Sequence, residues 1–395
     1  MVSRRKFLMI LLLGLVAVSE LQGEVPEKLI PVQRIGWPEE TRCLEMFSAL
    51  VLGPDGLVYA GTCNNKKIGG RLVSFDPGSG KQQVLLDVHE ITGEDGTQTY
   101  PQSKIHSQIC FDSRGTCWFG THSYEWNSLK QYQDSPEDYS GGYLISYNPK
   151  TKEARSHGIL APHESLMSMA LAESVGKIYA VTHPTGRFLV YDLKTEKTTD
   201  TGIALGYPSR IVVALKDGRG ITFTVNGDVV RYSPGSGTIE QLPVLVPTFD
   251  GETTRGHNSP FDLAVNADET AMYGIAYSSG ILFEYRPDDG PHGSIRSLGV
   301  AFGDEVVPGY RPELSIAMAV GRDGRVYYAG YSHNAGKIGC YDPRTAKRSY
   351  LGRMDAGPGT RPLEAGAMIS LPDGRLIVTT YDQTQTYYNL FHPEL

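Results

Sequence analysis

Short segments bounded by turn residues recur along most of this chain. Residues 165–202 divide into four of them: LMSMAL, KIYAVT, RFLVYDL and KTTDTG. Gly, Asp and Pro separate the segments, which is typical of strands joined by tight turns. No helical period competes with this pattern. The region is therefore predicted to form four antiparallel strands.

The third segment of this unit is repeated elsewhere with a common ending. An aromatic residue is followed by Asp, Asn, Ser or Arg and then by Pro (Leu in one copy), before a Gly- or Lys-rich turn. The six copies are RLVSFDPGSGK from Arg71, YLISYNPKTKE from Tyr143, RFLVYDLKTEK from Arg187, VVRYSPGSGT from Val229, ILFEYRPDDG from Ile281 and KIGCYDPRTAK from Lys337. Asp or Asn before Pro favours a tight turn. A repeat of roughly 40–50 residues with four strands indicates a β-propeller.

A seventh unit is incomplete. Residues 367–376, AMISLPDGRL, supply an innermost strand and its turn, and the chain ends soon after Phe391. We expect Lys28–Ile35 to provide the missing outer strand, because an unpaired sheet edge is a liability. The prediction is an all-β protein in which residues 24–395 form one seven-bladed propeller, its last blade closed by an N-terminal strand.

Residues 1–23 have the character of an export signal. Arg4, Arg5 and Lys6 precede an apolar run, Phe7–Val18, that is too short to span a bilayer. Residues 3–8, SRRKFL, resemble the twin-arginine signal, although an ordinary secretory signal is also consistent with them. No Cys follows the run directly, so a lipid anchor is not expected. The prediction is an exported protein, periplasmic or extracellular, with no stable membrane span.

Charge and cysteine content narrow the function further. The net charge is −7 and no basic run offsets it, which argues against nucleic-acid binding. A local basic pocket could still bind an acidic ligand. The five cysteines have no zinc-site spacing. At most one disulfide is expected, Cys43–Cys63, and the protein is expected to be a monomer.

Aligning the blades on the turn that ends the innermost strand locates residues near the central channel. Six residues before this turn, most blades carry a small or apolar residue, but His106 and Asp262 interrupt the pattern. Ten residues before it, a largely acidic and polar set includes Glu45, Glu164 and Asn258. These positions are expected to face the channel.

The loop after the second strand gives another aligned set, expected at the same mouth of the channel. It contains His122, His183, Tyr277, Tyr331 and Tyr381. Surface loops favour Gly, Ser, Asp and Lys, whereas His and Tyr suit proton transfer and sugar stacking. A structural alternative is that the tyrosines cover the ends of the blade cores.

His106 and His122 belong to one blade, 16 residues apart across a hairpin. The long loop that follows, Ser123–Gly141, is expected to form a wall or lid. Five further residues are expected near this mouth of the channel and are candidates for substrate binding: Arg187, Arg210, His257, Asn258 and His333.

The blade repeat, the export signal and the His/Tyr set together resemble secreted bacterial seven-bladed polysaccharide lyases, such as ulvan lyases and related uronate lyases. The specific likeness is His106 in KIHSQ, His122 in GTHS and the tyrosines. Such lyases use His and Tyr as acid/base groups and an Arg or His to neutralise the uronate carboxylate. Where they have a Tyr/Arg pair in the third blade, this chain has Met167 and His183.

The resemblance implies a secreted enzyme that cleaves a uronate-containing polysaccharide or oligosaccharide by β-elimination. This reaction needs a base, a neutralised carboxylate and an acid for the leaving oxygen. His106 or His122 is the expected base, and Tyr277 or Tyr331 the expected acid. Arg210 or His183 is expected to neutralise the carboxylate, with Tyr381 also binding substrate.

Two alternatives remain open. A metal-dependent hydrolase or lyase, similar to the lactonase or streptogramin-lyase groups, would use Glu45, Glu164 and Asp262 with Ca²⁺, Mn²⁺ or Zn²⁺. The β-elimination mechanism itself requires no cofactor. The other alternative is a binding propeller without catalysis, in which the His/Tyr set only stacks on a ligand.

Overall fold

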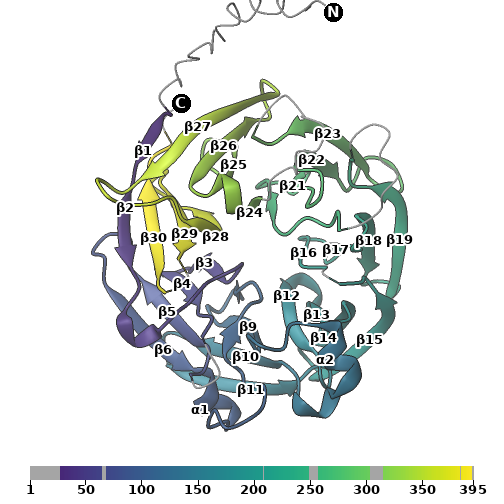
Figure 1. Cartoon of the computed structure of the whole chain (residues 1–395). Helices are drawn as coiled ribbons and strands as arrows, with labels where there is room; N and C mark the ends of the chain where they lie inside the picture. The colour runs from purple at the N-terminus through teal and green to yellow at the C-terminus, as the bar shows by residue number, and fades with distance from the viewer. Residues whose placement is uncertain are drawn as a thin grey trace, which may run out of the picture.

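The computed structural model describes residues 27–64, 68–207, 209–248, 257–302, 315–382 and 384–393. The predicted export signal, residues 1–23, lies outside this range. Seven sheets of four or five strands stand in a ring around a central axis, as Figure 1 shows. The predicted seven-bladed propeller is confirmed.

Each blade is an antiparallel sheet whose strands run outward from the axis in chain order. Blade 1 comprises β3 (Leu50–Leu52), β4 (Val58–Gly61), β5 (Arg71–Phe75) and β6 (Gln82–Asp87). Blade 2 comprises β7 (Lys104–Ile105), β8 (Cys110–Phe111), β9 (Cys117–His122), β10 (Tyr143–Asn148) and β11 (Glu153–Ile159). Blade 3 comprises β12 (Ser165–Ala172), β13 (Lys177–His183), β14 (Arg187–Asp192) and β15 (Lys197–Ala204).

The next blades follow the same order. Blade 4 comprises β16 (Val212–Ala214), β17 (Gly220–Phe223), β18 (Asp228–Ser233) and β19 (Thr238–Leu245). Blade 5 comprises β20 (Leu263–Val265), β21 (Met272–Ile275), β22 (Ile281–Arg286) and β23 (Ser294–Val300). Blade 6 comprises β24 (Ser315–Val320), β25 (Val326–Gly330), β26 (Lys337–Asp342) and β27 (Lys347–Asp355). Blade 7 comprises β28 (Glu364–Ser370), β29 (Leu376–Tyr381) and β30 (Thr386–Phe391), together with an N-terminal strand.

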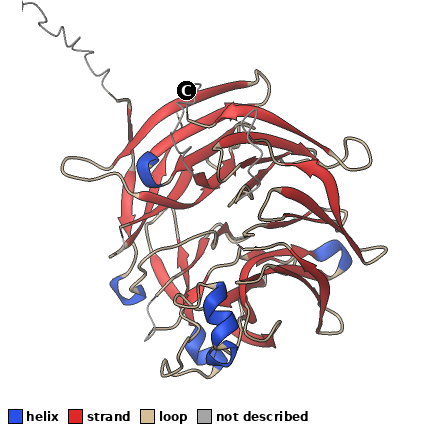
Figure 2. Cartoon of the chain, turned by 45° about the vertical axis from the view of Figure 1, so that its right-hand side comes forward, coloured by secondary structure: helices blue, strands red, loops and turns tan. Residues whose placement is uncertain are grey.

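Helices are few and short (Figure 2). They are η1 (Glu39–Thr41), α1 (Val88–Thr92), α2 (Leu129–Asp134), η2 (Pro136–Asp138), η3 (Glu173–Val175) and η4 (Ser332–Asn334). No helix within the described residues is long and apolar enough to span a membrane.

The six repeated motifs of the sequence are all third strands, as predicted. Their Asp or Asn then shapes the turn to the fourth strand. The Asp76 carboxylate accepts from Gly78 N at 2.8 Å, the Asn148 side chain from Lys150 N at 3.0 Å, and Asp192 from Thr195 N at 2.8 Å. Such side-chain turns explain why the motif recurs at this corner of each blade.

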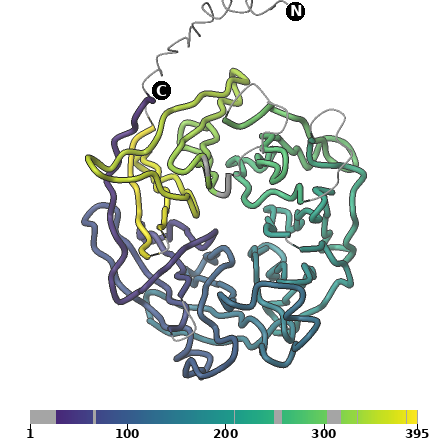
Figure 3. The backbone as a smooth tube through the Cα atoms, viewed as in Figure 1, coloured from purple at the N-terminus to yellow at the C-terminus, as the bar shows by residue number. Residues whose placement is uncertain are grey.

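The N-terminal segment closes the ring by joining two blades. In β2 (Gln33–Gly36), the chain pairs antiparallel with β30 and supplies the outer strand of blade 7. The preceding β1 (Leu29–Pro31) instead pairs parallel with β27 and extends blade 6. The predicted closing strand therefore exists but is divided in two. Figure 3 shows the purple segment that begins the described part of the chain beside the yellow C-terminal strands.

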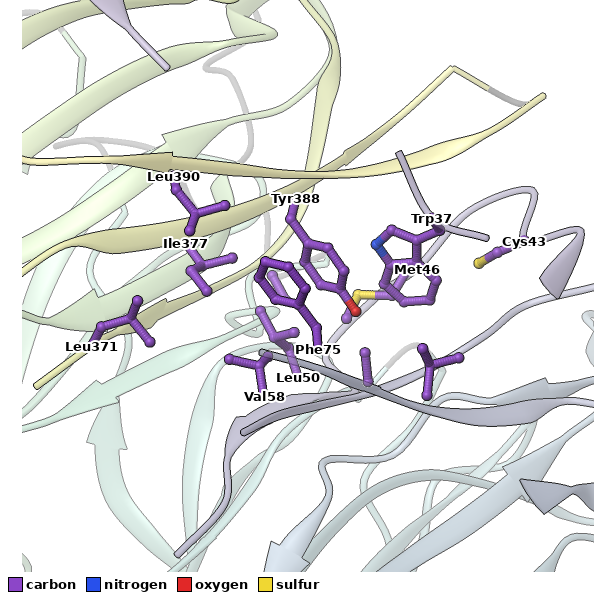
Figure 4. Packing of buried hydrophobic residues seen from close by; sticks show 13 residues of the cluster. Trp37, Cys43, Met46, Leu50, Val58, Phe75, Leu371, Ile377, Tyr388 and Leu390 are labelled. Carbon is purple, nitrogen blue, oxygen red and sulfur yellow. The ribbon is translucent and has the colours of Figure 1, made fainter. Parts of the chain in front are cut away.

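The hydrophobic cores lie between neighbouring blades. Where blade 7 meets blade 1, the ring of Tyr388 stacks on Phe75 with centroids 4.3 Å apart and on Trp37 at 5.0 Å (Figure 4). Ring pairs of this kind stabilise a core beyond their area of burial. This contact joins both ends of the chain and fixes the closure.

The predicted Cys43–Cys63 disulfide is wrong, because all five cysteines are free thiols. Cys43 and Cys63 are neighbours, as Cys63 N donates to Cys43 Sγ at 3.5 Å. Their thiols have different partners, however. Cys43 Sγ donates to the Glu45 carbonyl at 3.1 Å, whereas Cys63 Sγ lies 3.9 Å from the Glu45 carboxylate.

Candidate functional site

A pocket of about 370 Å³ lies where the inner ends of the blades converge. Its walls come from all seven blades, so it occupies one mouth of the central channel. It is lined by Glu45, Phe47, Ser48, Lys104, His106, His122, Tyr124, Asn127, Met167, His183, Tyr207, Arg210, Phe261, Tyr277, Tyr331 and Gly366. We call this the central pocket. Its volume is within the range of small-ligand sites.

A break in the inner strand of blade 2 places His106. The strand pairs with β9 at β7 and again at β8, and residues 106–109 leave the ladder between them. The Ser107 hydroxyl accepts from Gly120 N at 2.7 Å and replaces a backbone partner there. Released from the ladder, His106 reaches blade 3, where its Nδ1 lies 2.9 Å from the Met167 carbonyl oxygen.

Equivalent strand ends place the other two histidines. His122 ends β9 and His183 ends β13, the second strands of neighbouring blades. The rings of His106 and His122 have centroids 5.6 Å apart, and those of His122 and His183 are 5.1 Å apart. Phe47, 6.0 Å from His106, and Tyr207, 5.0 Å from His183, extend the stack at its two ends. We call the three stacked imidazoles the histidine row.

Carbonyl partners define the tautomers of two of these histidines. His106 Nδ1 faces the Met167 carbonyl, and His122 Nδ1 lies 2.5 Å from the Ser123 carbonyl. A carbonyl oxygen only accepts, so each Nδ1 carries the hydrogen and each Nε2 keeps its lone pair in the neutral form. His183 Nε2 is buried without a hydrogen-bond partner among the described residues.

All three histidines are neutral in the free protein at neutral pH. They are only 2–4% exposed, and this burial lowers the pKa of His106 and of His122 well below the ordinary value. It lowers the pKa of His183 to about 3. The nearby cations Lys104 and Arg210 add to the effect at His106 and His183. Such shifts in one pocket are typical of functional sites.

The two cations of the pocket differ in their partners. Lys104 Nζ lies 3.5 Å from Glu45 Oε1 and 4.8 Å from the centre of the Phe47 ring. Arg210 stacks over Phe261, with Cζ 4.3 Å from the ring centre. Its Nε is buried without an acceptor, and no carboxylate in the described part of the chain forms an ion pair with it. Arg210 can therefore bind an incoming anion.

Tyrosines from blades 5, 6 and 7 complete the site. Tyr277 and Tyr331 line the pocket, and Tyr277 packs on Phe261 with centroids 4.5 Å apart. Tyr381 lies behind the lining, against Phe47 at 5.3 Å. Burial raises the pKa of Tyr331 and of Tyr381, so both hydroxyls stay protonated. The site thus pairs lone-pair nitrogens with hydroxyl donors.

The long loop of blade 2 is a packed wall. Trp126 is fully buried, and its Nε1 donates to the His163 carbonyl at 3.1 Å. Tyr139, also buried, donates to Gln102 Oε1 at 3.2 Å. Asn127 lines the pocket, and its carbonyl accepts from Tyr207 OH at 3.3 Å. The wall therefore connects blade 2 with the segment that leads into blade 4.

Three other proposed substrate-binding residues, Arg187, His257 and Asn258, are not part of the central pocket lining. Arg187 is paired with Asp200, with Nε 2.8 Å from Oδ2. The Asn258 amide donates to the Val246 carbonyl at 3.2 Å, and His257 is exposed beside it. His333 falls in η4, and its side chain is outside the described part. The predicted role of His333 is therefore not tested by the structure.

The three proposed metal ligands do not come together. Glu45 lines the pocket, but Glu164 is buried and accepts from the Thr185 hydroxyl at 2.6 Å. Asp262 accepts from the amides of Leu263 and Met318, both at 2.9 Å, which joins β20 to β24. Burial raises the pKa of Asp262 to about 7. Within the described ranges, no three His, Cys, Asp or Glu side chains are arranged to hold a metal ion.

Several lining residues were not selected from the sequence. Lys104 pairs with His122 in the β7–β9 ladder, so strand register could have indicated it. Tyr207 lies ten residues before the turn of its blade, in the register expected to face the channel, but it was not chosen as a candidate. Phe47 and Phe261 lie in segments that lead into inner strands. The lengths of these segments differ between blades, and counting from the turns therefore fails there.

Comparisons with known proteins identify the fold. No protein-family model and no curated protein sequence matches the chain. A streptogramin B lyase structure aligns with TM-score 0.63 and 13% identity, over 91% of this chain and 96% of that one. Virginiamycin B lyase from Staphylococcus aureus aligns at 0.61 and 12%, over 91% and 98%. The RRP9 WD40 repeats align at 0.59 and 11%, over 91% and 100%.

These neighbours include lyases and WD40 propellers at similar TM-scores and at identities below 15%. Likeness at this level is a likeness of architecture, because one fold carries many functions. The chain is a seven-bladed β-propeller with distant structural similarity to streptogramin B lyase.

Proposed function

We propose that this protein is a carbon–oxygen lyase that cleaves an acidic polysaccharide or oligosaccharide at a uronate residue by β-elimination. The observation that carries the proposal is the histidine row beside Arg210. It combines neutral imidazoles, which can accept a proton, with a partly buried guanidinium that no carboxylate of the described chain pairs. Elimination next to a carboxylate needs both groups at once.

Arg210 is the proposed partner of the substrate carboxylate. Its planar N–H groups match a carboxylate in geometry, and burial strengthens the attraction. In the free protein, burial and, to a lesser extent, the charge of Arg210 lower the pKa of His183 and of His106. A bound carboxylate would raise the pKa of His183, because an opposite charge favours the protonated form. Neutralising the carboxylate in this way acidifies the C–H bond beside it.

His106 and His122 are the proposed bases. In each, a carbonyl holds Nδ1–H and fixes the plane of the ring, which leaves the Nε2 lone pair for the substrate. The C5–H proton passes to Nε2, and the C–H electrons form the C4–C5 double bond as the C4–O bond breaks. Tyr277 of blade 5 or Tyr331 of blade 6, both in the pocket lining, donates a proton to the leaving oxygen. Solvent then returns the imidazole's proton to the phenolate.

The lowered histidine pKa values fit this scheme when the substrate charge is included. A base works best when its pKa is near the working pH. In the free pocket, burial and two cations make the imidazoles weak bases. The anionic substrate offsets those cations and raises the imidazole pKa values toward that range.

Export is proposed as well, on the basis of residues 1–23, and would bring the enzyme to extracellular polymers. We propose no metal-dependent step, since Glu45, Glu164 and Asp262 do not form one site. The binding propeller remains a second candidate, because buried neutral imidazoles between aromatic rings also suit stacking on a sugar.

The test is incubation of the purified protein with polygalacturonate, alginate and a glucuronate-containing glycan, with a neutral glucan as control. Ultraviolet absorbance reports the unsaturated uronate product. We expect absorbance to rise with at least one acidic polymer and not with the glucan. Saturable binding of an acidic polymer without any absorbance change would favour the binding propeller instead.

A further inference from the structure

A second pocket, of about 420 Å³, lies between blades 2 and 3 away from the central pocket. Trp118 lines it near the start of β9, whereas His122 faces the central pocket from the end of the same strand. Four residues of extended strand separate the two, roughly 13 Å. We call this the interblade pocket.

One face of blade 2 forms its floor. Register places Trp118 opposite Ser146, and Ser146 opposite Arg155, in a row across β9, β10 and β11. The residues two positions along each strand point to the same side of the sheet. Three of them, Thr116, Asn148 and His157, also line the pocket. The floor is therefore a regular grid of side chains, most of them polar.

This grid differs from the equivalent face of blade 1. In blade 1, Ser74 pairs with Gln83, and Leu85 lies two positions beyond Gln83 on the same strand. Leu85 packs against a hydrophobic core. In blade 2 the matching position is His157. Polar groups thus replace an apolar contact at one blade interface, which stability alone does not require.

One hydrogen bond within blade 2 and one across the interface to blade 3 hold the aromatic groups in place. His157 Nε2 lies 2.9 Å from Ser146 Oγ, and His157 Nδ1 lies 3.3 Å from the Tyr191 hydroxyl of blade 3. The Trp118 and His157 rings have centroids 4.7 Å apart. The floor is consequently preorganised, with flat rings in fixed positions.

Two arginines lie at the rim of the interblade pocket, and some of their N–H groups are not used in contacts with the described residues. Arg155 Nη2 pairs with Glu196 at 2.7 Å, and Arg114 Nη2 pairs with Asp112 at 3.2 Å. Each guanidinium uses one nitrogen in these contacts, and its other N–H groups have no acceptor among the described residues. A guanidinium has five N–H donors. Both side chains are mostly exposed, at 61% and 78%.

We propose that the interblade pocket is a second, non-catalytic binding site for an acidic saccharide. The aromatic floor would take the apolar face of a sugar ring. The Asn148 amide and the Thr116 hydroxyl would bond to sugar hydroxyls, and the free N–H groups of Arg114 and Arg155 would bind a carboxylate. The inference rests on the proposed function only for the class of ligand, since it requires no turnover.

The test uses trigalacturonate as the probe, with maltotriose as the neutral control, in an Arg210→Gln background that disables the central pocket. Calorimetry should show one saturable site for trigalacturonate and none for maltotriose. Adding Arg114→Gln and Arg155→Gln should weaken this binding about tenfold or more, because charge-assisted hydrogen bonds are lost. Adding Arg344→Gln and Lys347→Gln, which remove two exposed charges from blade 6, should leave it unchanged.

The proposal would be overturned if the Arg114/Arg155 variant bound trigalacturonate as tightly as its Arg210→Gln parent. It would also be overturned if that parent did not bind trigalacturonate at all. All variants should melt cooperatively near the parent temperature, because the substituted side chains are exposed. Failure of the lyase proposal would be visible separately, as absence of unsaturated product from the wild-type protein whatever the interblade pocket binds.

Discussion

The imidazole rings of His122 and His183 stack across the boundary between blades 2 and 3, with centroids 5.1 Å apart and planes inclined by 28°. Two histidines this close cannot both be protonated in a buried site without strong repulsion. Burial, the largest cause of their lowered pKa values, keeps each of them neutral in the free protein. The contact also links His122, a proposed base, to His183, whose pKa a bound carboxylate would raise.

His122→Ala and His106→Ala should each reduce turnover by a factor on the order of 10²–10⁴, the usual contribution of an acid/base group. The histidine with the greater loss is the base. Initial rates on the substrate found in the polymer panel measure this, and thermal melting checks the fold. His122→Asn repeats the test with less loss of volume.

The control for these variants is Tyr387→Phe, which alters β30 but keeps the ring that Arg34 contacts at 5.5 Å. It should retain wild-type turnover. Near-normal rates in both histidine variants would show that His106 and His122 take no part in proton transfer.

Arg210→Gln should raise KM more than it lowers kcat for an acidic oligosaccharide, because the guanidinium binds the carboxylate before and during reaction. Arg210→Lys should recover only part of the loss, since Lys lacks the planar N–H fork. Arg187→Gln is the matched control, because Arg187 is already paired with Asp200. An equal effect of the two Gln variants would contradict the assignment of Arg210.

Stability should fall as the pH drops below about 6.5, the pKa of a histidine in the unfolded chain. The folded pKa of His183 is lowered, so below pH 6.5 the unfolded chain binds a proton that the folded chain does not. Stability is complete above pH 6.5 and is lost progressively toward the folded value of about 3. At pH 5 this costs roughly 2 kcal/mol for one such histidine.

His183→Gln should remove that contribution and make stability less dependent on pH between 7.5 and 5, measured by urea unfolding, while His106 and His122 still contribute theirs. His292→Gln, at an exposed position, should leave the dependence as in the wild type. An unchanged slope in His183→Gln would mean that His183 is not the buried neutral group described above.

Binding of an acidic ligand should be accompanied by net proton uptake near neutral pH. The ligand carboxylate raises the pKa of the histidine row, so the complex holds more protons than the free protein. Affinity should then increase as the pH falls toward the pKa of the ligand. Calorimetry in two buffers of different ionisation enthalpy measures the uptake, and no difference between the buffers would contradict it.

The repeated third strand made the fold predictable. Its side-chain turns, such as those of Asp76 and Asn148, are local and therefore visible in the sequence. The division of the N-terminal segment was not visible, because β1 follows β27 through contacts with residues more than 300 positions away. Local pattern contains no information about that pairing.

Part of the site could be predicted for the same reason. His122, His183, Tyr277 and Tyr331 occupy equivalent positions in repeating units, so counting brought them together. Asp262 was chosen by counting back from the inner turn, yet its carboxylate accepts from the Met318 amide of the next blade. Arg187 was expected in the site because of its charge, but Asp200, on the neighbouring strand, binds it. Contacts with residues of other strands, which the local sequence does not show, determine the positions of these two side chains.

The most direct test of the central claim is mass spectrometry of the product formed from a uronate oligosaccharide of defined length. β-Elimination leaves a new non-reducing end with a C4–C5 double bond, lighter by one water than the same fragment released by hydrolysis. We predict the lighter fragment, formed by the wild-type protein and strongly reduced in His122→Ala. A fragment with the mass of the hydrolysis product, or an intact oligosaccharide after prolonged incubation with wild-type protein, would contradict the account.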